Sequence, residues 1–278
     1  MGKLLADFET AMCERLRLFN VIKSAEEIEL DESLLPANEY RARAHVAWGA
    51  FNWTVLHSSF YKGLPMMHPP TYYPPEYVEP QVESLYHCIT LISSRNAMPY
   101  LGNTFAALCK FRVIHAGVVT DDDSLESAER RYHQFLNWAD HLRALDSQRQ
   151  RSGTPHHVLV LHIWLHTNIL NIFRPFISKG AALRTFTTNS TPEAISEASL
   201  MQLKYLVVEY WQSQPSAQYN ILWHPSLLYI GNAVLQNPRS TVDWRFYFDL
   251  CLDAYLQLYT CYQVAAGFLQ GYVCTTSR

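Results

Sequence analysis

DDDSLESAERRYHQFLNWADHLRAL, residues 121–145, is the stretch that decides the fold. Its apolar residues recur at steps of three and four, which is the spacing of one face of an α-helix. Asp121–Ser124 places oxygen acceptors and negative charge at the expected helix start, where free backbone N–H groups need partners. These carboxylates lack the spacing and closing glutamate of an EF-hand loop, so they predict a cap rather than a cation site. The apolar face comprises Leu125, Ala128, Tyr132, Phe135, Ala139, Leu142 and Leu145.

The same periodicity extends over most of the chain, and no segment alternates with a period of two. It predicts an all-α fold: a single large multi-helix domain of about eight to ten helices with one proline-rich loop. We expect residues 1–38 to form an N-terminal helix and an acidic connector, and residues 39–278 to form the main domain. Pro225 requires a kink or a break in its helix. The expected helices span residues 4–19, 39–62, 81–95, 102–115, 125–145, 155–174, 192–212, 217–236 and 242–270.

Residues 66–80 contain five prolines interleaved with three tyrosines. Such a segment cannot be helical, and an extended, polyproline-like conformation suits it better. One interpretation is a peptide ligand for an aromatic groove. The other, which we favour because the segment is short and flanked by helices, is a rigid loop laid across the domain by its tyrosines.

Composition excludes several classes of protein. Hydrophobic residues make up 49% of the chain and charged residues 17%, which favours a folded body over disorder. The net charge of -3 and scattered basic residues argue against direct binding of nucleic acid. Neither a signal peptide nor an apolar run long enough for a membrane span is found, so we expect a soluble intracellular protein with reduced cysteines.

No motif indicates catalysis. His162 and His166 stand four apart and share a helical face, but Ile163 occupies the place where a HExxH protease has its glutamate. Without a third ligand nearby, the pair is more typical of packed or surface histidines than of a metal site. Nucleotide-binding glycine motifs and nucleophile-elbow motifs are also missing. We therefore predict no catalytic residue, no metal ligand and no cofactor, and do not expect an enzyme.

A resemblance to a known family begins in the second expected helix. RARA at 41–44 and AWGAFNW at 47–53 lead to Gly63-Leu64-Pro65 and then to the proline-rich segment. This ordered string resembles the middle homology region of fungal zinc-cluster transcription factors. Residues 162–176, ending in Arg174-Pro175-Phe176, are similar to a second motif of the same family. The resemblance covers residues 41–270. Its motif positions are Arg41, Arg43, Trp48, Gly49, Phe51, Gly63, Pro65, Arg174, Pro175 and Phe176.

The chain also departs from the family. Thr54-Val55 stands where many members have Asp-Arg, and Leu64 where many have arginine, which indicates a divergent branch. The six-cysteine zinc cluster, its basic linker and the dimerisation segment are not in the sequence. Zinc is therefore expected only in that missing DNA-binding segment. A natural truncation and a gene-model fragment both remain open.

The resemblance implies a nuclear regulatory or effector domain of a transcription regulator, acting through protein partners such as a coregulator or homologous regulator, or through a small-molecule inducer. The motif residues then serve as scaffold: Trp48 and Phe51 would bury one face, and Arg174 would sit at a helix C-terminus, where a cation is favoured. The alternative from another class is a small all-α enzyme acting on an apolar substrate in an aromatic-rich pocket.

Overall fold

The computed structural model describes residues 11–18, 21, 26–27, 34–60, 68–72, 104–120, 124–147, 154–177, 183, 190–236 and 243–276. Within these residues all regular secondary structure is helical, which confirms the predicted all-α fold. The described part contains eight α-helices of seven or more residues, together with short 3-10 turns. None of these helices is both long enough and apolar enough to cross a bilayer.

The contacts divide the chain into two compact units. Unit 1 comprises Met1–Asp122 and Gln134–Gln148, and unit 2 comprises Asp123–His133 and Arg149–Arg278. Helix α6 (Leu125–Ser147) is therefore shared, with its first turns in unit 2 and the remainder in unit 1. The boundary expected after residue 38 lies inside unit 1 and stays a prediction.

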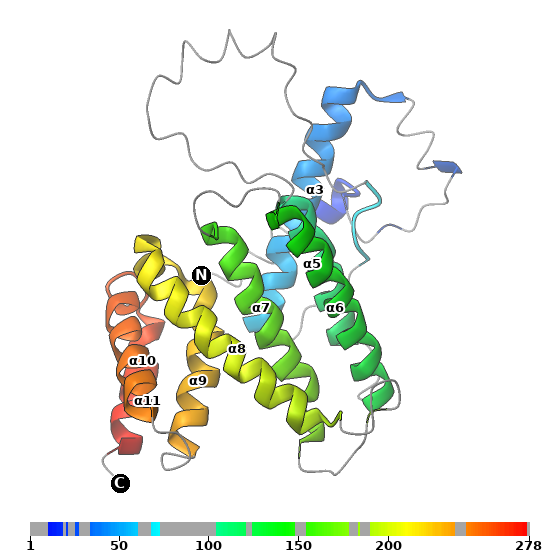
Figure 1. Cartoon of the computed structure of the whole chain (residues 1–278). Helices are drawn as coiled ribbons and strands as arrows, with labels where there is room; N and C mark the ends of the chain where they lie inside the picture. The colour runs from blue at the N-terminus through cyan, green and yellow to red at the C-terminus, as the bar shows by residue number, and fades with distance from the viewer. Residues whose placement is uncertain are drawn as a thin grey trace. The chain divides into compact units, whose positions relative to one another are not determined.

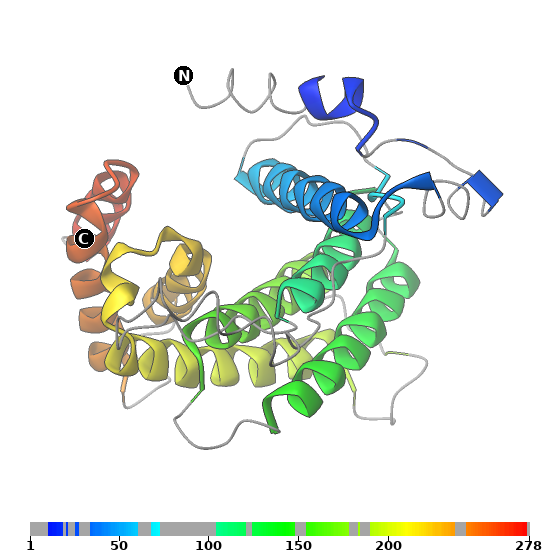
Figure 2. The same cartoon turned by 90° about the horizontal axis from the view of Figure 1, so that it is seen from above.

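Unit 1 is built around α3 (Ala37–Phe60), which contacts α5 (Thr104–Thr120) (Figure 2). The face of α3 that carries Trp48 and Phe51, which was expected to be buried, is buried from Ala44 to Val55, and Phe51 is fully buried. Phe111 on α5 packs against the Phe135 and Trp138 rings of α6, with centroids 5.3 and 5.0 Å away. The helical periodicity thus located these buried faces correctly.

In unit 2, α7 (His156–Phe173) and α8 (Pro192–Ser213) lie side by side (Figure 1). Helix α7 is buried on almost every side, which explains why its sequence is apolar throughout. Helix α9 (His224–Gln236) contacts both of them. The buried residues of α7 include a set that recurs at steps of three and four: Val158, Leu161, Leu165, Ile169 and Ile172.

Two helix starts have side-chain caps, and one of them lies in the cap predicted at Asp121–Ser124. The Thr191 side chain accepts a hydrogen bond from the Ala194 N–H at 3.2 Å, and Pro192 occupies the first turn of α8. Ser124 caps α6 in the same way, accepting from the Ser127 N–H at 3.2 Å. Asp121–Asp123, Gly63, Pro65 and the helix expected at 81–95 lie outside the described residues.

The single helix predicted over 242–270 is wrong. The structure has α10 (Trp244–Tyr259) and α11 (Val264–Thr276), which contact each other along a hairpin (Figure 1). No glycine or proline separates them, so local sequence supplied no stop signal. The break lets Tyr255 stack on Phe268, with centroids 5.5 Å apart, and tertiary packing thereby outweighs local helix propensity.

The helix predicted over 217–236 also begins later than expected. Two 3-10 turns, Pro215–Tyr219 and Ile221–Trp223, precede α9, whose first turn contains Pro225. Of the two expected solutions, a kink or a break, the chain adopts the break. Proline is tolerated in a first turn because its missing N–H needs no helical acceptor there.

Candidate functional site

Residues 68–72 of the proline-rich segment are held against α3. The Trp48 indole N–H donates to the Tyr72 backbone oxygen at 2.9 Å, and both side chains are buried. The Tyr40 and Tyr72 rings meet edge to face, with centroids 5.4 Å apart. We call Tyr40, Arg43, Trp48 and Tyr72 the α3 clamp. Tyr72 thus fits the interpretation of a loop fastened by its tyrosines, whereas Tyr73 and Tyr77 lie outside the described residues.

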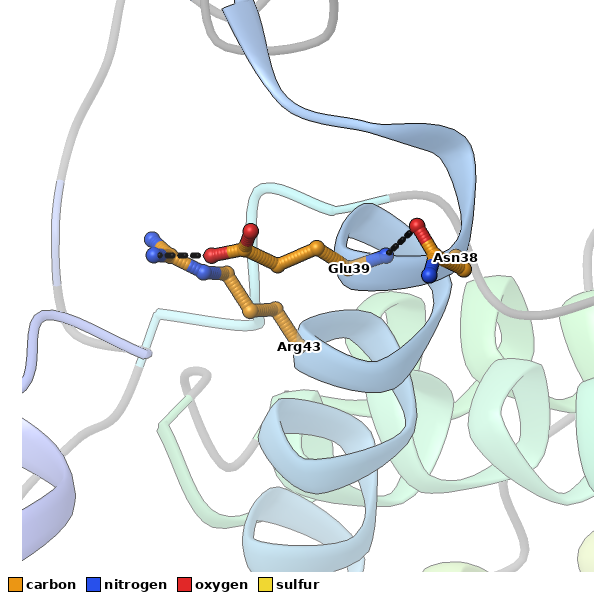
Figure 3. Close-up of polar contacts among 3 residues, drawn as sticks. All are labelled: Asn38, Glu39 and Arg43. Carbon is orange, nitrogen blue, oxygen red and sulfur yellow. Dashed lines mark hydrogen bonds and ion pairs between the residues drawn. The ribbon is translucent and has the colours of Figure 1, made fainter.

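Arg43 links the clamp to the start of α3. Its guanidinium donates to the Glu39 carboxylate at 2.8 Å, and the Glu39 N–H donates to the Asn38 side-chain oxygen at 3.0 Å (Figure 3). The hydrogen bond to Glu39, and then a smaller one to Tyr72, raises the pKa of Arg43. Both members of the ion pair are half exposed, so solvent screens most of their attraction. Arg41 is exposed.

Below the clamp, the inner face of α3 serves as scaffold. The Trp48 and Phe51 rings meet edge to face at 5.6 Å. The Asn52 amide donates to the Cys109 Sγ of α5 at 3.5 Å. Burial raises the pKa of the Cys109 thiol to about 11, which keeps it protonated and unreactive. These contacts stabilise the packing of α3 and supply no reactive group.

The opposite face of α3 is open. Val46 is 58% exposed and Trp53 is 53% exposed, one heptad apart. Gly49 lies between them, and a side-chain carbon added there would meet nothing within 4 Å. Exposed Ala42 precedes them at helical spacing. We call Ala42, Val46, Gly49 and Trp53 the outer face of α3.

The second motif forms the end of α7. Arg174 closes the helix by donating its backbone N–H to the Leu170 oxygen, and Arg174–Phe176 then form a 3-10 turn. Arg174 and Pro175 are exposed, and Phe176 is buried. Burial raises the pKa of the neighbouring Tyr229 hydroxyl, and the Arg174 charge acts in the opposite direction. The predicted position of Arg174 at a helix C-terminus agrees with the structure.

The structure also assembles a polar network that the sequence reasoning missed. The His156 Nδ1 lies 3.1 Å from the Tyr210 hydroxyl and 2.9 Å from the Ser216 hydroxyl. The Asn220 amide donates to the Tyr210 hydroxyl at 2.8 Å. Burial lowers the pKa of His156. Because Tyr210 and Ser216 are 54 and 60 residues away from His156, no local spacing connects these residues in the sequence.

A buried histidine, His224, lies between α9, α10 and α11. The His224 Nδ1 is 3.0 Å from the Tyr255 hydroxyl, and its ring lies 4.4 Å from that of Phe268. Burial lowers the pKa of His224 to about 4, so it is neutral near neutral pH. Beside it, burial raises the pKa of the Cys251 thiol to about 12. This cluster is part of the core of unit 2.

His162 and His166, the predicted helical pair, are both half-buried on α7. In the part of the chain that the structure describes, no group of three or more histidine, cysteine, aspartate or glutamate side chains is arranged to hold a metal ion.

Comparison with protein-family models, with curated proteins and with solved structures finds no match for this chain. The resemblance to the middle homology region of zinc-cluster regulators therefore stays a prediction, carried by the two sequence motifs alone.

Proposed function

We propose that this chain is a regulatory or effector module of a transcription regulator, acting in the nucleus through protein partners or a small-molecule inducer. Two features support this proposal, namely the burial of the motif positions and the outer face of α3. The motif positions Trp48, Phe51 and Phe176 are buried, which suits a module that works through its shape. Such a module would act by binding a partner or inducer more tightly in one conformation than in another.

The observation that carries the proposal is the outer face of α3. Tryptophan is enriched among the residues that dominate protein–protein interfaces, and here an exposed Trp53 shares its face with Val46. Open space beside half-buried Gly49 leaves the backbone between them accessible to a partner's side chains. We assign this face as the contact for a protein partner such as a coregulator or a homologous regulator.

A reporter assay tests the proposal. The full chain is fused to an unrelated DNA-binding domain with an activation segment, and reporter output in yeast is compared with the same fusion lacking this chain. A restraining module lowers the output and a licensing module raises it. The V46S/W53S variant should remove most of that effect, whereas M201S, at an exposed position in unit 2, should retain it.

Unchanged output from the wild-type fusion would contradict the regulatory role. An effect that survives V46S/W53S, with both variants folded by circular dichroism, would remove the outer face of α3 from the proposal.

The enzyme hypothesis has one observation of its own, the His156 network. The exposed Ser216 hydroxyl lies 2.9 Å from the Nδ1 of a histidine whose pKa burial lowers, and such a pair can activate a nucleophile when a third group orients the imidazole. Here Tyr210 occupies the same Nδ1, which favours a structural role. Labelling of Ser216 by a fluorophosphonate probe, abolished by H156A, would favour the enzyme instead.

A further inference from the structure

The described part of the proline-rich segment contains a compact recognition pattern. Pro69-Pro70-Thr71-Tyr72 places a tyrosine two residues after a proline pair, and Pro74-Pro75-Glu76-Tyr77 repeats this pattern in the sequence. The second copy lies outside the described residues, and the inference concerns the first. In a polyproline II helix three residues complete a turn, so Pro69 and Tyr72 fall on the same edge. Small domains of the WW type bind such helices in an aromatic-lined groove.

The α3 clamp already engages this pattern. Its tyrosine is buried beside Tyr40, and the Tyr72 carbonyl accepts a hydrogen bond from the Trp48 indole. An aromatic surface combined with an indole N–H donor is also the chemistry by which an aromatic groove binds a polyproline ligand. Pro70 is buried as well, whereas Pro69 is exposed.

The α3 clamp and the groove of a WW-type domain cannot bind Tyr72 at the same time. In the clamp the backbone bends at Thr71 and Tyr72, whereas a groove of the WW type requires an extended helix there. The Tyr72 ring is only 8% exposed in the clamp, so a partner cannot reach it while the clamp is closed. A partner domain therefore binds only the fraction of molecules in which the segment has left α3.

We propose that residues 69–72 are a ligand for a WW-type domain, and that α3 restrains this ligand by competing for Tyr72 through Trp48. The measured affinity equals the intrinsic affinity reduced by the fraction of open molecules. Any change that weakens the clamp and spares Pro69 and Tyr72 tightens partner binding. This inference goes beyond the proposed function and does not depend on it, because it concerns other residues than the outer face of α3.

The test measures binding of a purified WW domain that recognises Pro-Pro-x-Tyr peptides to the full-length chain by isothermal titration calorimetry. All proteins carry Y77A, so that only the first copy of the pattern is read. W48F removes the indole donor but keeps an aromatic ring. Y40A removes the ring of half-buried Tyr40, which contacts Tyr72 edge to face. Losing one buried hydrogen bond changes an opening equilibrium by about fivefold, so W48F should tighten binding about three- to tenfold. Y40A removes the edge-to-face ring contact with Tyr72, which is worth about 0.5–1.5 kcal/mol, so it should tighten binding by a similar factor.

Two further variants make the result specific. W138F removes an equivalent buried bond of unit 1, from the Trp138 indole to the Ala107 oxygen at 2.8 Å, and should leave the affinity unchanged. P69A alters an exposed residue outside the clamp, so it should leave thermal stability unchanged and weaken binding at least tenfold in the W48F background.

Equal affinity of W48F, Y40A and the Y77A parent would refute the restraint by α3. Binding that survives P69A, or no binding by any of these chains, would refute the assignment of residues 69–72 as a ligand. Tightening by W138F equal to that by W48F would also count against the clamp, because general loosening of unit 1 would then explain both. None of these outcomes affects the interpretation of the reporter assay, which tests Val46 and Trp53.

Discussion

Among the glycines that the structure describes, Gly231 on α9 is the one where an added methyl group should cost most. An ideal Cβ at this position would lie 2.0 Å from the Tyr272 hydroxyl and 2.5 Å from the ring carbon that carries it. Tyr272 is buried, its hydroxyl donates to the Leu227 oxygen at 3.3 Å, and its ring centroid is 5.8 Å from that of Tyr255. The tyrosine therefore has to give up both its hydrogen bond and its packing to make room.

The terms in G231A have opposite signs. Replacing a helical glycine by alanine gains about 1 kcal/mol from backbone propensity. Overpacking a core costs about 1–3 kcal/mol, and leaving a buried polar group without its partner costs about 1–3 kcal/mol more. The net expectation is that G231A lowers the free energy of unfolding by about 3 kcal/mol, within a range of about 1–5 kcal/mol.

Urea unfolding followed by far-ultraviolet circular dichroism measures this difference. The matched control is G267A on α11, in the same unit, where an added Cβ meets nothing within 4 Å and only the propensity gain of up to about 1 kcal/mol applies. In a Y272A background, G231A should become neutral or stabilising, because the clashing ring is gone. A G231A protein as stable as wild type, or stabilised like G267A, would refute the reasoning.

Three more predictions follow from burial. The pKa of His224 is lowered to about 4 from an ordinary 6.5, so the unfolded chain binds more protons than the folded chain between these pH values. The stability contributed by the neutral imidazole is therefore complete above about pH 6.5. It is lost as pH falls to 4, and the loss is on the order of 3 kcal/mol. H224Q should flatten that part of the stability profile measured by thermal unfolding, and an unchanged slope would contradict it. Iodoacetamide should alkylate exposed Cys261 well before Cys251, whose pKa burial raises to about 12, and mass spectrometry of peptides reads the order; simultaneous labelling of the folded protein would count against this. F51A should lower the free energy of unfolding in urea by about 3–5 kcal/mol, whereas F246A, at a half-exposed site, should lower it by less than about 1 kcal/mol. Comparable losses of stability in the two variants would show that burial does not determine the cost.

Sequence reasoning was most accurate where the information is local. The starts of α6 and α8 depend on Ser124 and on Thr191-Pro192, whose side chains act within their own helix turns. The buried residues of α3 follow from a period of 3.6, because every turn of a helix returns to the same face. Those of α7 follow from an apolar sequence that is buried on almost every side. These features could be predicted because each depends on residues fewer than about eight positions apart.

The candidate site was predictable only in part. The motif positions identified α3 and the end of α7, and the tyrosines of the proline-rich segment suggested a loop fastened to the domain. The partner of Tyr72 was not predictable, since Trp48 lies 24 residues away and forms no pattern with it. The His156 network joins residues 54 and 60 positions apart, and the sequence carries no signal for either pairing.

By itself, the sequence determined the all-helical class, the inner faces of the main helices and several of their ends, because periodicity and capping act over one or two turns. Only the tertiary structure decided that α10 and α11 are separate helices, that the Tyr72 carbonyl meets the Trp48 indole, and that Tyr272 requires glycine at position 231. Each of these depends on surfaces distant in the chain fitting at close range, where a shift of one or two ångströms changes a favourable contact into a clash. Such close packing depends on two segments together, so the sequence of one helix alone does not predict it.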